Sequence, residues 1–446
     1  MVAKQSSGER LSRRTVLKMS GVGVGAAGIA GCVSMEDDGD DGGNDTGPDD
    51  GGDDTGATDN DGGTGLDTVT LGFLIPISGP IASLGAEMEA SVGLAVEQIN
   101  AGTGLDLDFE IETAIRDTET DTSTAVRQAD RLVSDDGADV IIGPIESGTS
   151  FAVSDWATDE EILVAPASSS VALTGADCNE YTFRAETHSG QAAEGGAEWV
   201  VDNLGTDVWF HIADYAYGQS VREEWGTRVE ANGATIVGET APAQGTENFE
   251  PQISQIRDAD PDVVIMGSAG ADLFNFMGQA AQQGLTQETN LFGDSSVVQL
   301  TRNAIGMAAV NTYGMARFNP TFDDDRMRRF VEAWREETGR IPGNFSRTGY
   351  QTVTMVAQGI QAAGTTEGDA LSDTLEGLPV ETFFGETQFR ACDHQSVNPV
   401  WVAEFVQPGE GDLPDPSDEL PDIRYLDYAP GEDAVPACED VGCDLG

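Results

Sequence analysis

The sequence predicts an α/β fold of two similar lobes, each with a mostly parallel sheet covered by helices. Three observations carry this prediction. From Thr68 onward, short apolar segments alternate with amphipathic segments of helical length. The alternation restarts at residues 208–214, VWFHIAD. At the end of the first series, residues 141–170 hold two buried strands, each ended by Pro and followed by small residues that open a helix.

The first series begins at residues 68–80, TVTLGFLIPISGP, which read as a strand ended by a Pro and Gly turn. Its expected helices lie at 83–100, 123–136 and between the last two strands, and its remaining strands lie at 107–117, 140–142 and 163–165. The carboxyl ends of parallel strands share one edge of the sheet. Free N-H groups at two adjacent helix starts there favour an anion.

The second series predicts strands at 208–214, 235–241 and 263–268, with helices at 217–233, 249–260 and 272–284. Beyond Thr312 we expect helices at 325–338, 348–364 and 370–378. Residues 383–406 indicate an antiparallel strand pair with a turn at 393–396, and a short strand is possible at 423–428. The acidic, Pro-rich segment after Gln407 is expected to be frayed.

The charge of the chain is strongly negative, with a formal net value of -57. After the first 31 residues there are 17 Arg, 78 Asp plus Glu and no Lys. Such a surface resembles the proteins of extreme halophiles and would repel itself in low salt. It argues against nucleic acid as a partner, because phosphate contacts need clustered cations.

The first residues indicate an export signal. Arg13 and Arg14 form a twin-arginine pair, a weakly apolar run follows, and Ala30-Gly31 precede Cys32. The apolar run is shorter than the ~20 residues needed to span a bilayer. The order resembles a twin-arginine lipoprotein signal, in which Cys32 becomes the lipidated first residue and anchors the protein to the membrane.

Residues 33–67 contain 13 Asp or Glu among Gly, Thr, Asn and Pro, which predicts an extended acidic tether. The run lacks the spaced ligands and closing Glu of a calcium loop. Asn44 and Asn344 stand in glycosylation sequons.

Catalytic and metal signatures are missing from the sequence. There is no GxSxG, no HExxH and no phosphate loop with its Lys. His188, His211 and His394 are scattered and read as satisfied or solvated. We therefore expect no enzyme activity, no cofactor and no metal.

Several segments, taken in order, resemble the type I periplasmic binding proteins of ABC importers. They are PISGP with ASLGAEMEASVGLAVEQIN, RDTETDTSTAVRQADRLVSDDGADVIIGPIESG, VAPASSSVALT, YTFR and ADYAYGQS. The likeness spans about Thr68 to Val406 and is greatest to the receptors for branched-chain amino acids, amides and urea. It implies two lobes that are joined by three crossings and close on a ligand as a hinge.

The resemblance also implies ligand contacts. Ser147 with Gly148, and Ala167, Ser168 and Ser169, match the places that hold an amino acid's carboxylate and ammonium. Tyr217 matches an aromatic that covers the ligand. In LFGDSS, Asp294 or else Ser295 matches a carboxylate that faces the ammonium. The serines could instead serve only as helix N-caps, Tyr217 could be core packing, and Asp294 an ordinary turn residue.

Two departures from the family pattern concern the pocket floor. Leu84 stands where leucine-type receptors often have an aromatic, and residues 267–272, GSAGAD, lack an expected aromatic. The resemblance therefore does not define which side chain the ligand carries.

The remaining cysteines are even in number, as expected for disulfides in an oxidising compartment. Three pairings are possible. Cys178 with Cys392 is favoured because both flank predicted hinge crossings, and Cys438 with Cys443 because they are close in sequence. Zinc binding by CEDVGC competes, but no other near Cys or His completes a set.

These features predict an extracellular, membrane-anchored, monomeric binding protein that delivers a small polar solute, such as a branched-chain amino acid, to an ABC permease. A sensor for an amino acid, amide or urea, and a surface protein without a ligand, are the alternatives. The expected organisation is a signal peptide at 1–31, a tether at 32–67, lobe 1 at 68–185 and 313–385, lobe 2 at 186–312 and 386–430, and an acidic tail at 431–446.

Overall fold

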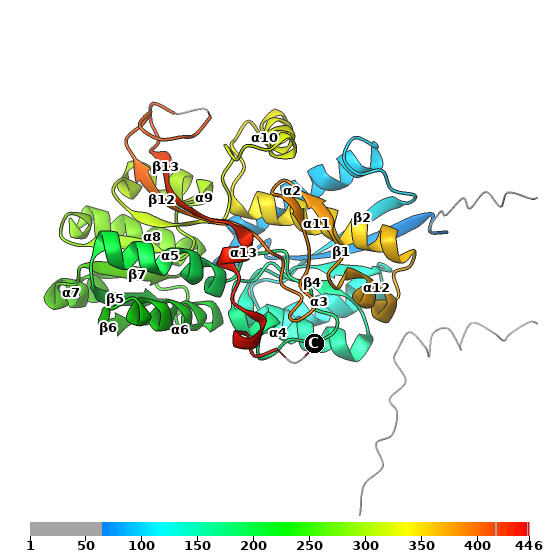
Figure 1. The fold of residues 1–446 in the computed structure, drawn as a ribbon, viewed down its shortest axis with the longest axis horizontal. Helices are drawn as coiled ribbons and strands as arrows, with labels where there is room; N and C mark the ends of the chain where they lie inside the picture. Colours follow the sequence, from blue (N-terminus) through cyan, green and yellow to red (C-terminus); the bar gives the residue numbers. More distant parts are fainter. Residues whose placement is uncertain (1–64, 415–416, 444, 446) are drawn as a thin grey trace, which may run out of the picture. The chain divides into compact units, whose positions relative to one another are not determined.

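The computed structural model describes residues 65–414, 417–443 and 445. All of them lie in one compact unit of the chain, Thr64–Gly446. The predicted signal, Cys32 and nearly all of the tether are outside the described residues. Figure 1 shows two halves of this unit, each built on its own sheet, with the first at the blue and cyan end of the sequence.

The first sheet has the strand order β2-β1-β3-β4, and all of its pairings are parallel. Its strands are β1 (Thr68–Ile75), β2 (Glu110–Asp117), β3 (Val140–Ile142) and β4 (Val164–Ala165). The connecting helices are α2 (Ala82–Asn100), α3 (Thr122–Ser134) and α4 (Ser147–Glu160). β1 and β3 are buried apolar runs, as central parallel strands require.

The second sheet has the order β13-β12-β9-β8-β7-β5-β6. Its strands are β5 (Asp207–Ile212), β6 (Thr235–Thr240), β7 (Val263–Gly267), β8 (Asn290–Gly293), β9 (Tyr313–Ala316), β12 (Val400–Val406) and β13 (Asp422–Ala429). Its helices are α5 (Ser189–Leu204), α6 (Ala216–Ala231), α7 (Glu250–Ala259), α8 (Gly270–Gln282) and α9 (Gln299–Ile305). β12 is antiparallel to both of its neighbours, while the other pairings are parallel. The two-lobe α/β prediction is confirmed.

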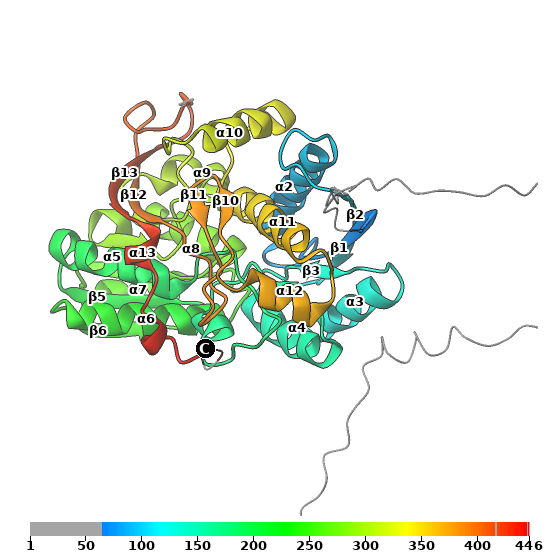
Figure 2. The same ribbon diagram turned by 45° about the vertical axis from the view of Figure 1, so that its right-hand side comes forward.

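The remaining elements return to the first half. They are α10 (Asp325–Thr338), α11 (Asn344–Ala363), α12 (Gly368–Leu375), and the hairpin of β10 (Val380–Thr382) and β11 (Gly385–Thr387). α11 shares an apolar core with α2 and β1, and Figure 2 shows α11 and α12 beside the first sheet. β9 pairs in the second sheet, so the return follows residue 316 and not 312.

The strand pair predicted within residues 383–406 is different in the structure. β11 pairs with β10, whereas β12 pairs with β9 and β13. The residues between β11 and β12 instead cross between the halves. There, Arg184 N-H donates to the carbonyl of His394 at 2.9 Å, and Ser396 N-H donates to the carbonyl of Arg184 at 2.9 Å. The predicted turn exists, with His394 at φ 54°, but tertiary pairing redirects its flanks.

The favoured disulfide pairing was wrong. The structure joins Cys178 to Cys443 and Cys392 to Cys438. After β13 the chain forms α13 (Gly431–Ala434) and runs back past the hinge toward the first half, in red in Figure 1. There the Arg390 guanidinium donates to the carbonyl of Pro436 at 2.6 Å, so each tail cysteine meets a distant partner.

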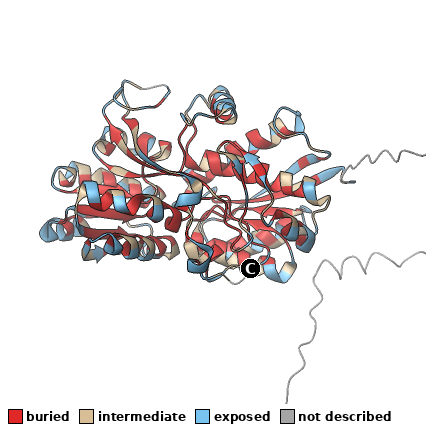
Figure 3. Ribbon diagram, viewed as in Figure 1, coloured by how far each residue is buried: buried red, intermediate tan, exposed pale blue. Residues whose placement is uncertain are grey.

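Short 3-10 helices lie at Val171–Thr174, Leu285–Gln287, Gly306–Ala309 and Cys438–Asp440. Separate buried clusters fill the space on the faces of each sheet, and Figure 3 shows the sheets largely in red, the colour of buried residues. Among the described helices, none is long and apolar enough to cross a bilayer.

Candidate functional site

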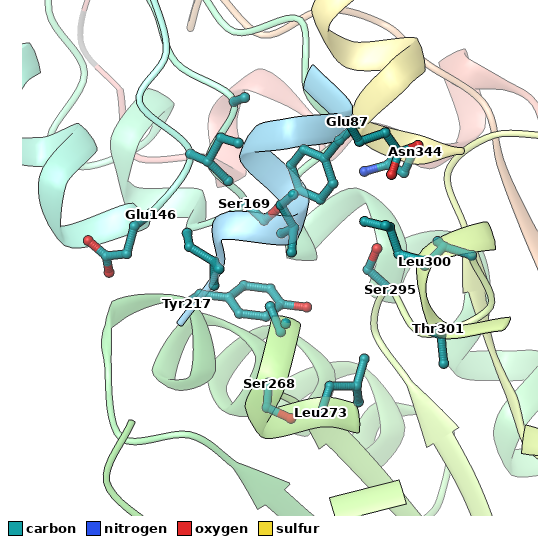
Figure 4. Close-up of a pocket in the computed structure, with 18 of the residues that line it drawn as sticks. Glu87, Glu146, Ser169, Tyr217, Ser268, Leu273, Ser295, Leu300, Thr301 and Asn344 are labelled. Atoms are coloured by element: carbon teal, nitrogen blue, oxygen red, sulfur yellow. The ribbon is translucent and has the colours of Figure 1, made fainter. Parts of the chain in front are cut away.

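A cavity of about 60 Å³ lies between the two halves, at the carboxyl ends of their parallel strands. Strand ends, helix starts and one crossing segment form its wall (Figure 4). The wall is mainly apolar, with few charged groups. It is lined by Ile81, Leu84, Glu87, Ile145, Glu146, Ser147, Ala167, Ser169, Tyr215, Tyr217, Ser268, Ala269, Gly270, Leu273, Phe274, Ser295, Val298, Leu300, Thr301, Arg317, Asn344 and Phe345.

The two Pro-ended strand ends of the first half lie side by side as predicted, but only the first opens an α-helix, α4. The second leads into the short 3-10 helix Val171–Thr174. Ala167 N-H donates to the carbonyl of Pro144 at 2.8 Å, which ties the end of β4 to the turn before α4. Gly143, at φ 93°, lets the turn before α4 lie against β1, since a Cβ there would lie 2.1 Å from the carbonyl of Leu74. Ser147 and Ser169 consequently line one wall together.

The N-terminus of α4 faces the cavity with one cap already in place. Glu146 is the N-cap, and its Oε2 accepts from Thr149 N-H at 2.7 Å. Ser147, the first helical residue, is buried, and no hydrogen bond of its hydroxyl occurs among the described residues. The capping role that the sequence left open for serine thus belongs to Glu146, and Ser147 is available to a ligand.

Two other predicted residues of this wall do not line the cavity. Gly148 lies next to the Glu146 carboxylate. Ser168 is buried, and its carbonyl accepts from Arg184 at 3.2 Å. Leu84, by contrast, lines the cavity from α2.

The second half contributes the starts of α6, α8 and α9. Tyr217 lines the cavity while its hydroxyl donates to Asp294 Oδ2 at 2.8 Å, so it both packs and faces the site. Burial and the nearby Asp294 charge raise the pKa of Tyr217. Although GSAGAD lacks an aromatic, Phe274 one turn later lines the cavity.

Asp294 does not reach the cavity. Its carboxylate is fully buried and accepts from Trp225 Nε1 at 2.7 Å, from Tyr217 and from Arg317. Ser295, the alternative that the sequence left open, lines the cavity. In the described structure Asp294 therefore supports the wall from behind.

Arg317, which the sequence analysis did not single out, connects the wall to the hinge. It follows β9, and its guanidinium donates to Ser169 Oγ at 2.5 Å, to Glu186 Oε1 at 3.0 Å and to the carbonyl of Thr187 at 2.6 Å, as well as to Asp294. Glu186 is also paired with Arg347 at 3.1 Å. Arg in the otherwise apolar run YGMARF was the available signal.

Glu87 was also missed. It lies on α2, one turn after Leu84, and is only 7% exposed. Its Oε1 accepts from Ser346 Oγ at 2.6 Å and from Ser346 N-H at 3.2 Å. A carboxylate on the buried stripe of an amphipathic helix was the signal that could have identified it.

A backbone hydrogen bond joins the two lobes beside the cavity. Ala271 N-H, in the first turn of α8, donates to the carbonyl of Pro80, which precedes α2, at 3.3 Å. A Cβ at Gly270 would lie 2.8 Å from the same carbonyl. The halves therefore meet closely beside the cavity.

The histidines have structural roles. His188 caps α5, with its Nδ1 accepting from Gln191 N-H at 3.0 Å, and burial and nearby Arg184 lower its pKa. His211 stacks on Phe276, and burial lowers its pKa to about 3. Among the described residues, no group of three or more potential ligands could hold a metal ion.

The Asn344 sequon is not accessible for glycosylation. Its side chain is buried, and its Nδ2 donates to Glu186 Oε1 at 3.0 Å. Asn44 lies outside the described residues.

Comparisons with known proteins agree with this architecture. The chain is 24% identical over 326 residues to the Leu, Ile, Val, Thr and Ala-binding protein of Pseudomonas aeruginosa, covering 72% of this chain and 86% of that protein. It is 26% identical to a Leu/Ile/Val-binding protein homologue of Brucella melitensis, with 71% and 86% covered.

Solved structures share the fold. An amino acid ABC transporter substrate-binding protein from Pseudomonas fluorescens has a TM-score of 0.75 at 21% identity, covering 85% of this chain and 99% of that chain. A solute-binding protein of an ABC transporter from Rhodopseudomonas palustris, in complex with 3,4-dihydroxybenzoic acid, has a TM-score of 0.73 at 21% identity, with 82% and 98% covered.

The family described as periplasmic binding protein matches residues 68–411, which include the first sheet, every strand of the second sheet except β13, and every residue that lines the cavity. Together with the two α/β lobes, this match shows that the chain belongs to the type I periplasmic binding proteins.

Proposed function

We propose that this protein is the substrate-binding component of an ABC importer and captures a small, largely apolar amino acid between its lobes. The observation that carries the proposal is the cavity itself, where the start of α4 and Ser147 meet a mainly apolar wall. The helix start suits a carboxylate, and the apolar wall suits a hydrocarbon side chain.

The size of the cavity supports a small solute. About 60 Å³ corresponds to room for roughly four to six water molecules. Leu84, Ile145, Leu273 and Phe274 line it, so an aliphatic group would be in contact on several sides. Relatives whose names record Leu, Ile and Val binding support the same class.

Binding would act through closure of the lobes. A ligand held by both halves favours the closed form, and that form would dock on the membrane permease. Ligand capture without chemistry agrees with a family of binding proteins, and we propose that the protein acts as a monomer.

We further propose export by the twin-arginine route and anchoring on the extracellular face through lipid on Cys32. The supporting observation is the order of Arg13 and Arg14, the apolar run and the small residues before Cys32. A Cys32→Ser variant should then be released into the medium, whereas replacing both arginines with lysine should retain the precursor inside. Release of the wild type in equal amount would contradict anchoring.

The acidic surface supports a halophilic source. A net charge of -57 with so few cations requires screening, so the denaturation midpoint should rise steeply with KCl concentration. A midpoint that is independent of salt would contradict this proposal.

Calorimetry in molar KCl tests the function. The titrants are apolar amino acids, amides, urea and aromatic carboxylates, each also used in thermal unfolding. We expect heat and a raised unfolding temperature with at least one apolar amino acid. Absence of both with every amino acid overturns the proposal, and tight binding of only an aromatic carboxylate would reassign the ligand. Loss of labelled-ligand uptake in cells lacking the protein would distinguish transport from sensing.

A further inference from the structure

Several polar atoms of the cavity wall are buried without a hydrogen-bond partner among the described residues. They are Glu87 Oε2, Ser268 Oγ, Thr301 Oγ1 and Arg317 Nε. Buried polar groups are nearly always hydrogen-bonded in native proteins, and an unpaired one carries a desolvation cost. Such atoms in the wall of a binding cavity indicate groups that the ligand satisfies.

Glu87 differs from the other three because it is a carboxyl group. Ser346 satisfies Oε1 through its hydroxyl and its N-H, so that oxygen is fixed in place. Oε2 has no partner, and Glu87 makes no ion pair with any described residue. Burial raises the pKa of Glu87, and the Ser346 hydrogen bonds and the more distant Arg340 oppose this. The side chain is therefore positioned but not electrostatically compensated.

The other carboxylates around the cavity are already engaged. Asp294 and Glu186 both pair with Arg317, and Glu186 pairs in addition with Arg347. Glu146 caps α4 through Thr149. In the wall, the charge of Arg317 is balanced by Asp294 and Glu186. The buried carboxyl group of Glu87 has no such partner among the described residues.

Figure 4 shows Glu87 beside Asn344 at the end of the cavity opposite Ser268 and Leu273. It extends from α2, in the first lobe. The family resemblance instead implies that a residue of LFGDSS in the second lobe binds an amino acid's ammonium. In the structure, however, Asp294 is paired with Arg317, and Ser295 lines the cavity in its place.

We propose that Glu87 Oε2 accepts a hydrogen bond from the ligand's amine and selects amine-bearing carboxylates over simple carboxylates. This inference rests on the proposed function, because it concerns the same cavity. An ammonium satisfies the unpaired oxygen and supplies the missing positive charge, and hydrogen bonds between ionised groups are about twice as strong as neutral ones. A simple aliphatic or aromatic carboxylate would leave Oε2 unpaired and add a second negative charge.

The test compares matched ligands and matched variants by calorimetry in molar KCl. The ligands are L-valine, 2-hydroxy-3-methylbutanoate and 3-methylbutanoate, which differ only at the amine position. The variants are Glu87→Gln, which keeps the shape and the acceptor for Ser346, and Glu89→Gln, which removes an exposed carboxylate two residues later on α2. Thermal unfolding of each variant checks that the fold is intact.

Wild type and Glu89→Gln should bind L-valine alike and bind 3-methylbutanoate at least about tenfold more weakly, the factor that corresponds to one charge-assisted hydrogen bond. Glu87→Gln should lose about tenfold for L-valine and much less for 3-methylbutanoate. Unchanged valine affinity in Glu87→Gln, or an equal loss for both ligands, overturns the role of Glu87. If wild type binds no amino acid at all, the proposed function itself is overturned and this inference falls with it.

Discussion

Arg317 of the cavity wall and Asp294 behind it form a buried ion pair, with side-chain exposures of 1% and 0%. Arg317 belongs to the crossing after β9, whereas Asp294 follows β8 in the second lobe. The same guanidinium donates to Ser169 of the first lobe at 2.5 Å. This pair therefore links the hinge and both lobes at the place where the ligand is proposed to bind.

Removing the Asp294 carboxylate should strongly destabilise the protein. In Asp294→Ala, Arg317 loses a partner in a dry environment, and Trp225 and Tyr217 lose their acceptor. Breaking a buried ion pair from one side costs about 3–5 kcal/mol. Chemical denaturation in molar KCl measures the change, and Asp214→Ala, an exposed carboxylate of the same lobe, should stay within about 0.5 kcal/mol of wild type. Similar losses in the two variants would contradict the role of the pair.

The architecture could be predicted because each lobe is built from local, repeated signals. The spacing of apolar residues within a segment predicts its secondary structure. Examples are the buried run Val140–Ile142, which stops at Pro144, and the apolar stripe of α3. The strand at β12 was also recognised, but its partners were not, since β9 is more than eighty residues earlier in the chain. Pairing between distant segments depends on tertiary packing and not on spacing.

The site was predictable in part for the same reason. Ser147, Ala167 and Ser169 reach the cavity because strand ends and helix starts fix their positions. Asp294 and Ser295 are adjacent, and alternate residues of a turn point to opposite sides, so the choice between them needed the position of Arg317. The disulfides were mispaired because only the return of the tail past Arg390 brings Cys438 to Cys392.

Filling the cavity at Ser147 should abolish binding without unfolding the lobe. Ser147 is the first residue of α4 and lines the cavity, so Ser147→Leu places a side chain where the ligand's carboxylate is proposed to lie. Calorimetry should detect no heat with any ligand that binds wild type. Ser123→Leu, in the exposed first turn of α3, is the matched control and should bind normally. Retained affinity in a folded Ser147→Leu protein would show that this register of the site is wrong.

Adding one methyl group at Gly270 should hinder closure. Its Cβ would lie 2.8 Å from the carbonyl of Pro80 and 3.1 Å from Ile81 Cγ2, across the contact between the lobes. Gly270→Ala should weaken ligand binding by about tenfold, equivalent to about 1.4 kcal/mol, and reduce the compaction that small-angle X-ray scattering detects on ligand addition.

The control for Gly270→Ala is an alanine at another glycine of positive φ, where an added Cβ meets no neighbouring atom. Gly284 follows α8 at φ 79°, close to the 58° of Gly270, and a Cβ there meets nothing within 4 Å. Gly284→Ala should therefore close and bind as wild type does. Equal losses of affinity in the two variants would assign the effect to backbone strain and not to closure.

The tail disulfides should stabilise the contact between the lobes. Cys178 lies in the first half, and Cys443 follows the last strand of the second sheet, so their bond adds a covalent connection between the two lobes. Cys178→Ser with Cys443→Ser should lower the free energy of unfolding by about 2–5 kcal/mol. Mass spectrometry of a non-reduced digest should recover the peptide pairs 178 with 443 and 392 with 438. Recovery of 438 joined to 443 would contradict the structure.

The pH dependence of stability should report Glu87 in the empty protein. Burial raises its pKa above the ordinary value of 4.5, so the folded chain holds this proton at pH values where the unfolded chain has released it. The contribution of Glu87 to stability is therefore greatest below pH 4.5, falls as the pH rises, and stops changing above the raised value, because its slope follows the difference in protons bound by this group. The glutamine of Glu87→Gln does not titrate. The unfolding free energy of this variant should therefore increase relative to that of wild type as the pH rises through this range.

Chemical denaturation of the two proteins at a series of pH values, without ligand and in constant KCl, measures this difference. Glu89→Gln removes an exposed carboxylate from the same helix and should give a curve parallel to that of wild type. A saturating amine-bearing ligand should weaken this contribution of Glu87, because the ammonium favours ionised Glu87 and lowers its pKa. Affinity for that ligand should then increase as the pH rises through the titration of Glu87. An affinity that stays constant in this range would show that Glu87 does not contact the amine.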